Sequence, residues 1–257
     1  MQSFFKDTLQ VRIHPTRETM GLDAANHIVD CLSGLLAQQE LVNMIFAAAP
    51  SQHEVLAELC NSKGLDWHRV NAFHMDEYVG LSNDAPQRFG QFLDQAIFKQ
   101  LPFRTVNYIQ ADAVNAQVEC NRYADLLHQY PADLVCMGIG ENTHIAFNDP
   151  HVADFNDPFL VKLVELDEVS RMQQVNDGCF ETLDRVPRQA ITLTIPALMQ
   201  AAHVFCVVPG PTKAEAIRHT LQEEIKPMYP STILRRHPDA TLFMDLAAAQ
   251  QLNDVHD

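Results

Sequence analysis

Positively charged residues are scarce in this sequence, and their scarcity limits what the chain can bind. The 257 residues include 18 Lys and Arg against 33 Asp and Glu, which gives a formal net charge of −15 at pH 7. This excess of negative charge argues against nonspecific binding of nucleic acid or of an anionic membrane, because both partners are negatively charged themselves. A small local group of cations can still hold a phosphate.

Long apolar runs and a leader sequence are also missing. No apolar stretch approaches the roughly 18–20 residues that a membrane-spanning helix needs. The first residues, Met-Gln-Ser-Phe-Phe-Lys-Asp, have neither the charged nor the apolar section of a signal peptide. We therefore expect a cytoplasmic protein with no membrane partner.

Closely spaced metal ligands are absent from the sequence as well. The six cysteines form no Cys-x-x-Cys motif, and the twelve histidines form no His-x-x-x-His pair. Widely spaced cysteines in a chain without a secretory signal favour free thiols over disulfides or a zinc site. The cysteines are Cys31, Cys60, Cys120, Cys136, Cys179 and Cys206. We expect no metal site.

What the sequence does contain is a repeated alternation of apolar runs and helical patterns. Runs suited to strands occur at 41–49, 69–77, 106–109, 132–137, 159–166, 190–196 and 203–208. Apolar residues at helical spacing occupy 20–37, 88–101, 114–129 and a short piece at 197–201. This alternation predicts an α/β fold: a single Rossmann-like domain over residues 1–257, with a largely parallel sheet flanked by helices.

The stretch from Gly138 to Pro150 concentrates polar groups directly after one buried strand. It reads Gly-Ile-Gly-Glu-Asn-Thr-His-Ile-Ala-Phe-Asn-Asp-Pro and follows the apolar run 132–137. Ligands of open α/β sheets bind outside the carboxyl ends of the strands. A polar loop with a surface histidine is the simpler interpretation, but this density of hydrogen-bonding side chains favours an active-site loop.

Two acidic residues end another predicted strand. Asp76 and Glu77 close the run 69–77 and precede Tyr78. Adjacent acids are usually solvated surface residues. Their place at the end of a strand makes them candidates for acid–base chemistry.

Two junctions between a strand and a helix suit an anion. After Pro50, Ser51 and Glu54 match a capping box, and a helix that begins there offers unpaired amide N–H groups to a phosphate. After the strand 203–208, Lys213 lies in the first turn of a helix that we expect Thr212 and Glu215 to cap. A lysine there opposes the helix dipole, which indicates an anionic partner; a solvated surface lysine is the alternative.

Three blocks of the sequence together resemble the glucosamine-6-phosphate deaminase (isomerase) family, whose fold is shared with 6-phosphogluconolactonases. The blocks are 73–81, 138–150 and 208–214, and 191–195 and 230–234 support them. Met75-Asp76-Glu77-Tyr78 and His144-Ile145-Ala146-Phe147-Asn148 look like the deaminase branch. The lactonase branch usually has a Thr-Ala-Ser-Leu-Phe-Pro type of tail after its histidine.

The resemblance implies conversion of glucosamine 6-phosphate, or a close hexosamine 6-phosphate, to a ketose 6-phosphate with release of ammonia and without a cofactor. It implies that Asp76 is the base at C2, that His144 opens the sugar ring and that Asp149 orients the histidine. The implied phosphate site contains Ser51, Ala49, Gly140, Lys213 and, as nearest counterpart of the family's arginine, Arg171.

The sequence departs from the family pattern at three points. Asn142 and Thr143 stand where the family has Asp and Gly before the histidine, so an amide must help to orient His144. Asp149 replaces a Glu. The family's Thr-Gly-Gly-Thr-Pro phosphate loop is replaced by residues 48–52, Ala-Ala-Pro-Ser-Gln, and the loss of both glycines changes how closely the backbone can approach a phosphate.

Two other functions remain open from the sequence. The first is a 6-phosphogluconolactonase-type hydrolase, or another sugar-phosphate isomerase, that uses the same acid–histidine pair; release of ammonia separates it from a deaminase. The second is a sugar-phosphate sensor without catalysis, which Asn142 favours and Asp76, His144 and Lys213 disfavour. In each case the partner is a small sugar phosphate rather than nucleic acid, and a homo-oligomer is left open.

Overall fold

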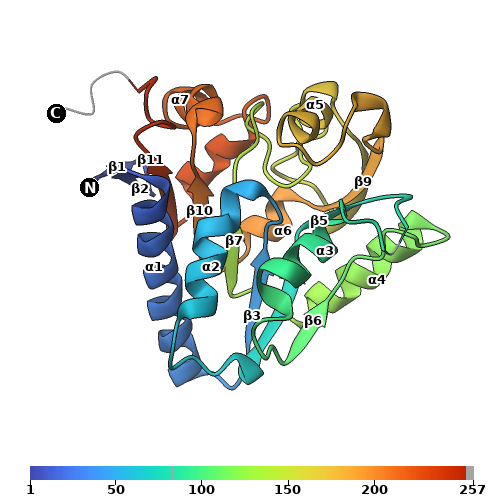
Figure 1. Cartoon of the computed structure of the whole chain (residues 1–257), viewed down its shortest axis with the longest axis horizontal. Coiled ribbons are helices and arrows are strands. Elements are labelled where there is room, and N and C mark those ends of the chain that lie inside the picture. Colours follow the sequence, from blue (N-terminus) through green and yellow to red (C-terminus); the bar gives the residue numbers. More distant parts are fainter. Residues whose placement is uncertain (83, 253–257) are drawn as a thin grey trace.

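A large, mostly parallel sheet forms the centre of the computed structural model, which describes residues 1–82 and 84–252 (Figure 1). Its strands are β1 (Gln2–Lys6), β2 (Leu9–His14), β3 (Val42–Phe46), β4 (Val70–His74), β6 (Thr105–Asn107), β7 (Leu134–Met137), β10 (His203–Val208) and β11 (Ala240–Asp245). They lie in the order β1-β2-β11-β10-β7-β3-β4-β6, and every neighbouring pair is parallel except the hairpin β1–β2. The predicted α/β fold with a largely parallel sheet is confirmed.

A small antiparallel sheet continues from the end of β4. It contains β5 (Asp76–Tyr78), β9 (Gln189–Leu193) and β8 (Val161–Glu165), in the order β5-β9-β8. Met75 joins the two sheets, because its N–H donates to Phe46 O (3.3 Å) and its carbonyl accepts from Leu193 N (2.8 Å). The run predicted as one strand, 69–77, is therefore two strands, and Asp76 lies where they part.

Helices cover both faces of the large sheet. Packed on one face are α1 (Arg17–Gln38), α2 (His53–Asn61) and α3 (Phe89–Leu93), which continues as a π-helical piece (Asp94–Phe98). Packed on the other are α4 (Ala116–Gln129), α6 (Ile195–Met199) and α7 (Ala214–Gln222). Helix α5 (Glu168–Asn176) follows β8. Short 3₁₀ helices occupy Pro50–Gln52, Trp67–Arg69, Leu183–Arg185, Pro211–Lys213 and Pro230–Arg236.

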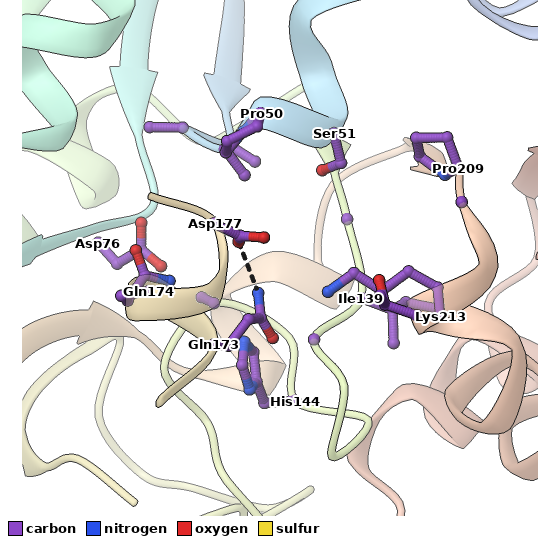
Figure 2. Close-up of a pocket in the computed structure, with 18 of the residues that line it drawn as sticks. Pro50, Ser51, Asp76, Ile139, His144, Gln173, Gln174, Asp177, Pro209 and Lys213 are labelled. Atoms are coloured by element: carbon purple, nitrogen blue, oxygen red, sulfur yellow. Dashed lines mark hydrogen bonds between the residues drawn. The ribbon is translucent and has the colours of Figure 1, made fainter. Parts of the chain in front are cut away.

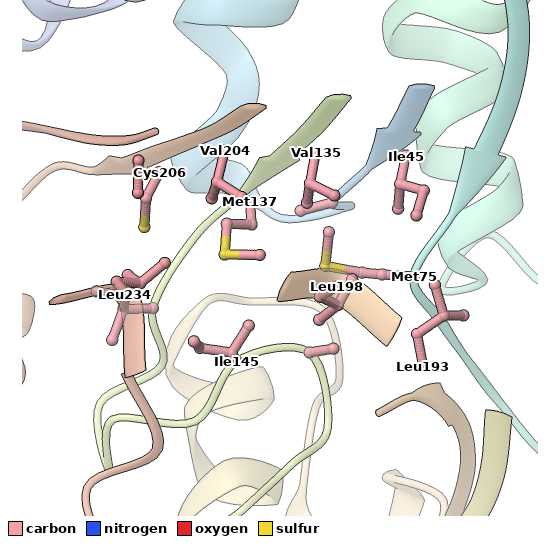
Figure 3. Close-up of a cluster of buried hydrophobic side chains, with 14 of the residues drawn as sticks. Ile45, Met75, Val135, Met137, Ile145, Leu193, Leu198, Val204, Cys206 and Leu234 are labelled. Carbon is pink, nitrogen blue, oxygen red and sulfur yellow. The ribbon is translucent and has the colours of Figure 1, made fainter. Parts of the chain in front are cut away.

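Side chains of the central strands alternate between two apolar clusters. In β3, Met44 packs against the face that carries α1 and α2, whereas Ile45 packs with Val135 and Leu198 on the other face (Figure 3). Each aliphatic side chain buried in this way contributes about 1.5–3 kcal/mol relative to an exposed one. Burial on both faces explains why these strands appear in the sequence as continuous apolar runs.

Both predicted helix caps are wrong. The N-cap of α2, which begins at His53, is Gln52 rather than Ser51, and it makes no side-chain hydrogen bond. Helix α7 begins at Ala214 with Lys213 at its N-cap, and no side chain caps it. In both places a proline-led 3₁₀ turn precedes the helix, so Ser51 and Thr212 lie one residue before the observed N-caps, Gln52 and Lys213. Within the described part of the chain, no helix is long and apolar enough to cross a membrane.

Candidate active site

A pocket lies where β3, β4, β7 and β10 end, the position expected for a ligand of an open α/β sheet. Most of its wall comes from the segments that follow these strands: 47–51, 75–76, 138–140 and 209–213. Of the predicted site residues, it is lined by Ala49, Ser51, Asp76, Gly140, His144 and Lys213. Asp76 and Lys213 face each other across it, with Ser51 and His144 on the remaining sides (Figure 2). Helix α5 contributes Gln173 and Gln174.

The loop that carries His144 is held in a strained conformation. Thr143 has φ 69° and Ala146 has φ 50°, in the left-handed region that β-branched residues in particular avoid. The Thr143 carbonyl accepts a hydrogen bond from Ser231 N (3.0 Å), and the Thr143 hydroxyl donates to Asn142 O. These bonds fix the turn. Glycine, which the resembling family has at this position, adopts a positive φ without strain. Strain of this kind is typical of functional loops.

The hydrogen bonds of Asn142 determine which nitrogen of His144 carries the proton. Asn142 Oδ1 accepts from the backbone N–H of His144 (3.2 Å), and its Nδ2 donates to Asp149 Oδ1 (3.1 Å). The same Oδ1 lies 2.7 Å from His144 Nδ1. Since an oxygen without a proton can only accept, the network assigns the ring proton to Nδ1. The neutral ring then has an unprotonated Nε2 that can act as a base.

Asp149 supplies a buried negative charge behind the imidazole. Its carboxylate is fully buried, with Oδ1 3.1 Å from His144 Nδ1, and it accepts from Ser170 Oγ and Asp167 N. Burial alone would raise the pKa of Asp149, but the hydrogen bonds and charge of His144, together with Ser170 and Asn142, hold it below the usual range. The carboxylate therefore stays ionised and can stabilise an imidazolium. Ser170, whose Oγ lies 2.9 Å from Nδ1, was not predicted from the sequence.

The adjacent acids Asp76 and Glu77 have different surroundings. Glu77 is fully buried, and its carboxylate accepts from the backbone N–H groups of Tyr78, Phe89 and Gly90, so it anchors the start of α3. Asp76 faces the pocket, and no described residue donates a hydrogen bond to its carboxylate. Burial and then the charge of Glu77 raise the pKa of Asp76 well above its usual range.

Lys213 lies across the pocket from Asp76, and Ser51 lies on an adjacent side (Figure 2). Lys213 is buried, which lowers the pKa of its ammonium, although Asp177 and Glu141 oppose this effect. Ser51 Oγ accepts from Gln52 Nε2 (3.1 Å). Its hydroxyl hydrogen is consequently left to point into the pocket and donate to a ligand.

Two predicted phosphate contacts do not have the expected geometry. Arg171 does not line the pocket; its Nη2 donates to Leu183 O (2.7 Å) and Val186 O (3.0 Å) and so holds the chain after α5. The Gly140 N–H donates to His144 O (2.9 Å) and is not available to a phosphate. What Gly140 provides is space, because a Cβ there would lie 2.1 Å from His144 Nε2.

Arg17, which the sequence analysis did not single out, also lines the pocket. It is the first residue of α1 and is therefore, like Lys213, a cation at the start of a helix, where it opposes the helix dipole. Ser170, by contrast, has no sequence signal: it is a serine in a polar helix, brought to His144 by tertiary packing.

Fold and pocket together define a Rossmann-like α/β protein with an acid–histidine site at the carboxyl edge of its parallel sheet. The chain belongs to the family described as glucosamine-6-phosphate isomerases/6-phosphogluconolactonase, whose pattern matches residues 15–243. The resemblance drawn from the three sequence blocks is confirmed.

Several relatives are glucosamine-6-phosphate deaminases. One from Exiguobacterium sp. is 35% identical over 194 residues, which cover 76% of this chain and 74% of that protein. One from Bacillus cereus is 38% identical over 202 residues, with 79% and 75% covered. A solved monomeric glucosamine-6-phosphate deaminase superposes with a TM-score of 0.86 at 25% identity, covering 93% of this chain and 98% of that one. The 6-phosphogluconolactonase of Thermotoga maritima shares the fold, with a TM-score of 0.73, 18% identity and 92% and 98% coverage.

Proposed function

We propose that this protein is a glucosamine-6-phosphate deaminase, which converts glucosamine 6-phosphate and water to a ketose 6-phosphate and ammonia. The observation that carries the proposal is the convergence of Asp76, His144 and Lys213 on one pocket from three separate strand ends. Relatives named as this enzyme support it. The following steps are derived from the chemistry that such a conversion needs.

His144 opens the sugar ring in this proposal. Its unprotonated Nε2 takes the proton of the C1 hydroxyl and returns a proton to the ring oxygen, which leaves an open-chain aldehyde. The imidazolium that forms during the transfer is stabilised by the Asp149 carboxylate, 3.1 Å from Nδ1. Asn142 and Ser170 keep the ring in the productive tautomer.

Asp76 then moves a proton from C2 to C1. Loss of the C2 proton to Asp76, with a proton passing from the C2 ammonium to the C1 oxygen, gives an enolamine. Return of the proton from Asp76 to C1 gives a protonated imine at C2, which water hydrolyses to the ketone and ammonia. Asp76 must be ionised to act as the base, yet burial and the charge of Glu77 raise its pKa. A substrate that brings an ammonium group to C2 supplies the missing cation and favours the carboxylate.

The phosphate binds on the opposite side, where Lys213 offers a buried cation and Ser51 a free hydroxyl hydrogen. We further propose a cytoplasmic location, since all six cysteines are free thiols. The net charge of −15 supports the absence of a nucleic-acid partner.

The test is to incubate the purified protein with glucosamine 6-phosphate and to measure ammonia and ketose together. Equal amounts of both, lost in Asp76→Asn, would support the proposal. Hydrolysis of 6-phosphogluconolactone without any ammonia from the amino sugar would replace it with the hydrolase. Binding of sugar phosphates with no product of either kind would replace it with a sensor.

A further inference from the structure

Lys213 alone does not balance the negative charge that a bound phosphate would add to this pocket. A phosphate monoester carries up to two negative charges, and Asp76 and Asp177 add negative charge to the same pocket. Arg171, the arginine assigned by resemblance, binds backbone carbonyls elsewhere. Within the described ranges, the lysine and arginine side chains that line the pocket are Lys213 and Arg17.

Close packing of two helices places Arg17 at the pocket. Gly21 lies one turn after Arg17 in α1, and a Cβ on Gly21 would lie 2.5 Å from Glu54 Cβ in α2. The missing side chain therefore lets the two helices touch. This contact brings the start of α1 next to the loop that carries Pro50 and Ser51.

Hydrogen bonds fix the guanidinium of Arg17 at this place. Nε donates to Glu54 Oε1 (2.8 Å), and Nη2 donates to Glu54 Oε2 (3.0 Å) and to Pro50 O (3.2 Å). A guanidinium has five N–H groups. Among the described residues, the two on Nη1 have no hydrogen-bond partner. Arg17 thus keeps its charge, is held in one orientation and has two donors left for a ligand.

The backbone of the adjacent loop, residues 48–52, offers few hydrogen-bond donors to a phosphate. Ala49 and Pro50 stand where the family has glycines that let the backbone approach a phosphate closely, and Pro50 has no N–H. A side-chain donor anchored to the Pro50 carbonyl reaches the same part of the pocket from the neighbouring helix. The positive charge of the guanidinium strengthens a hydrogen bond from Nη1 to a phosphate oxygen.

We propose that Arg17 is the second cation of the phosphate site, with Nη1 donating to the phosphate group of the sugar phosphate opposite Lys213. This rests on the proposed function only in taking the pocket to bind a phosphate monoester. Arg17 binds substrate and takes no part in the proton transfers.

The decisive comparison is between Arg17→Gln and Arg122→Gln. Arg122 is a matched control outside the pocket: it is 39% exposed against 40% for Arg17, and its guanidinium also binds one carboxylate at two points, Glu119, and one backbone carbonyl, Tyr108 O. Both variants lose an arginine ion pair of the same kind. Only Arg17→Gln removes donors from the pocket.

The primary measurement is calorimetric titration with inorganic phosphate, which needs no catalysis. A hydrogen bond to a charged group is worth about 1.5–3 kcal/mol, so Arg17→Gln should weaken phosphate binding about tenfold or more. Arg122→Gln should bind phosphate as the wild type does. With glucosamine 6-phosphate, Arg17→Gln should raise KM by a similar factor and leave kcat nearly unchanged. Arg17→Lys, which keeps the charge but not the anchored guanidinium, should bind phosphate with an affinity between those of wild type and Arg17→Gln.

The outcomes separate this inference from the proposed function. Equal phosphate affinity in Arg17→Gln and wild type would overturn it, and so would a wild-type protein that binds no phosphate. Phosphate binding that depends on Arg17 in a protein that releases no ammonia would support the anion site while refuting the deaminase. Equal weakening in both variants would mean that loss of an ion pair, rather than of a ligand, is responsible.

Discussion

The imidazole of His144 occupies the space that a side chain at position 140 would fill. A Cβ built on Gly140 would lie 2.1 Å from both Cε1 and Nε2 of the ring, far inside any real contact distance. Position 140 therefore sets where the histidine can lie, even though it supplies no functional group.

Gly140→Ala should reduce kcat/KM by about a hundredfold or more, because a displacement of about 1 Å of a catalytic group can cost that much. The methyl group forces the imidazole away from Asn142 and Asp149. Gly34→Ala is the control, since nothing lies within 4 Å of a Cβ there. That helical substitution should keep activity and stabilise the fold by about 0.5–1 kcal/mol. If Gly140→Ala had the same kcat/KM as the wild type, catalysis would not depend on the position of the His144 ring.

Asp76→Asn should lower kcat by about 10²–10⁴-fold, the usual contribution of a general base, with little change in substrate binding. A variant that retained most of its kcat would show that Asp76 is not the base. The control for the loss of a pocket carboxylate is Asp177→Asn, which should keep most of the turnover.

The same variant should also be more stable than the wild type, in a pH-dependent way. Burial holds the pKa of Asp76 in the folded protein above its unfolded value of about 3.9. Above that value the unfolded chain releases the proton more readily than the fold does, so Asp76 costs stability as the pH rises. The gain in melting temperature for Asp76→Asn should be small near about pH 4 and larger near about pH 7. An equal gain at both would contradict a raised pKa of Asp76 in the folded protein.

Lys213→Ala should raise KM more than it lowers kcat, because a phosphate contact acts mainly through binding. Burial lowers the pKa of Lys213, so its ammonium is lost at a lower pH than that of an exposed lysine. KM of the wild type should therefore rise with pH on the alkaline side. Lys213→Arg, which remains charged, should not show this rise. If KM rose with pH in Lys213→Arg as it does in the wild type, the rise would not come from Lys213.

Asn142→Asp tests the departure from the family pattern. Two carboxylates would then lie beside His144 Nδ1, where one amide oxygen lies at 2.7 Å now. Because the added negative charge favours the protonated imidazole, the acidic limb of kcat/KM should move to higher pH. Asn115→Asp, the same change at the exposed N-cap of α4, should leave the profile in place. An unmoved limb in Asn142→Asp would mean that position 142 does not influence the histidine.

Strands with both faces covered were predictable because nothing but apolar residues suits them, and β3, β7 and β10 are of this kind. The hairpin β1–β2, strand β11 and helix α5 were not predicted. β1 is mostly exposed at the edge of the sheet, and α5 buries only Ser170 and Gln173, so neither displays an apolar pattern. β11 is fully buried, but no chemical motif marks it in the sequence.

Local motifs predicted residues that line the pocket where these lie at a strand end or in the loop that follows it, as for Asp76 and His144. They failed where a residue distant in the sequence determines which contact a side chain makes. Glu54 matched a capping box, but Arg17 of another helix takes its carboxylate. Arg171 has the right residue type in a neighbouring helix, yet its side chain turns toward the carbonyls of Leu183 and Val186.

The position of β11 between β2 and β10 has a consequence for synthesis of the chain on the ribosome. The N-terminal hairpin is made first, but it joins the sheet only when the last strand arrives to bridge it to β10. Asp245 at the end of β11 also accepts from Gly210 N (3.0 Å), in the turn that leads to Lys213. A nascent or truncated chain without β11 therefore exposes two unpaired strand edges, which invite association with other chains, and lacks a support of the turn that presents Lys213.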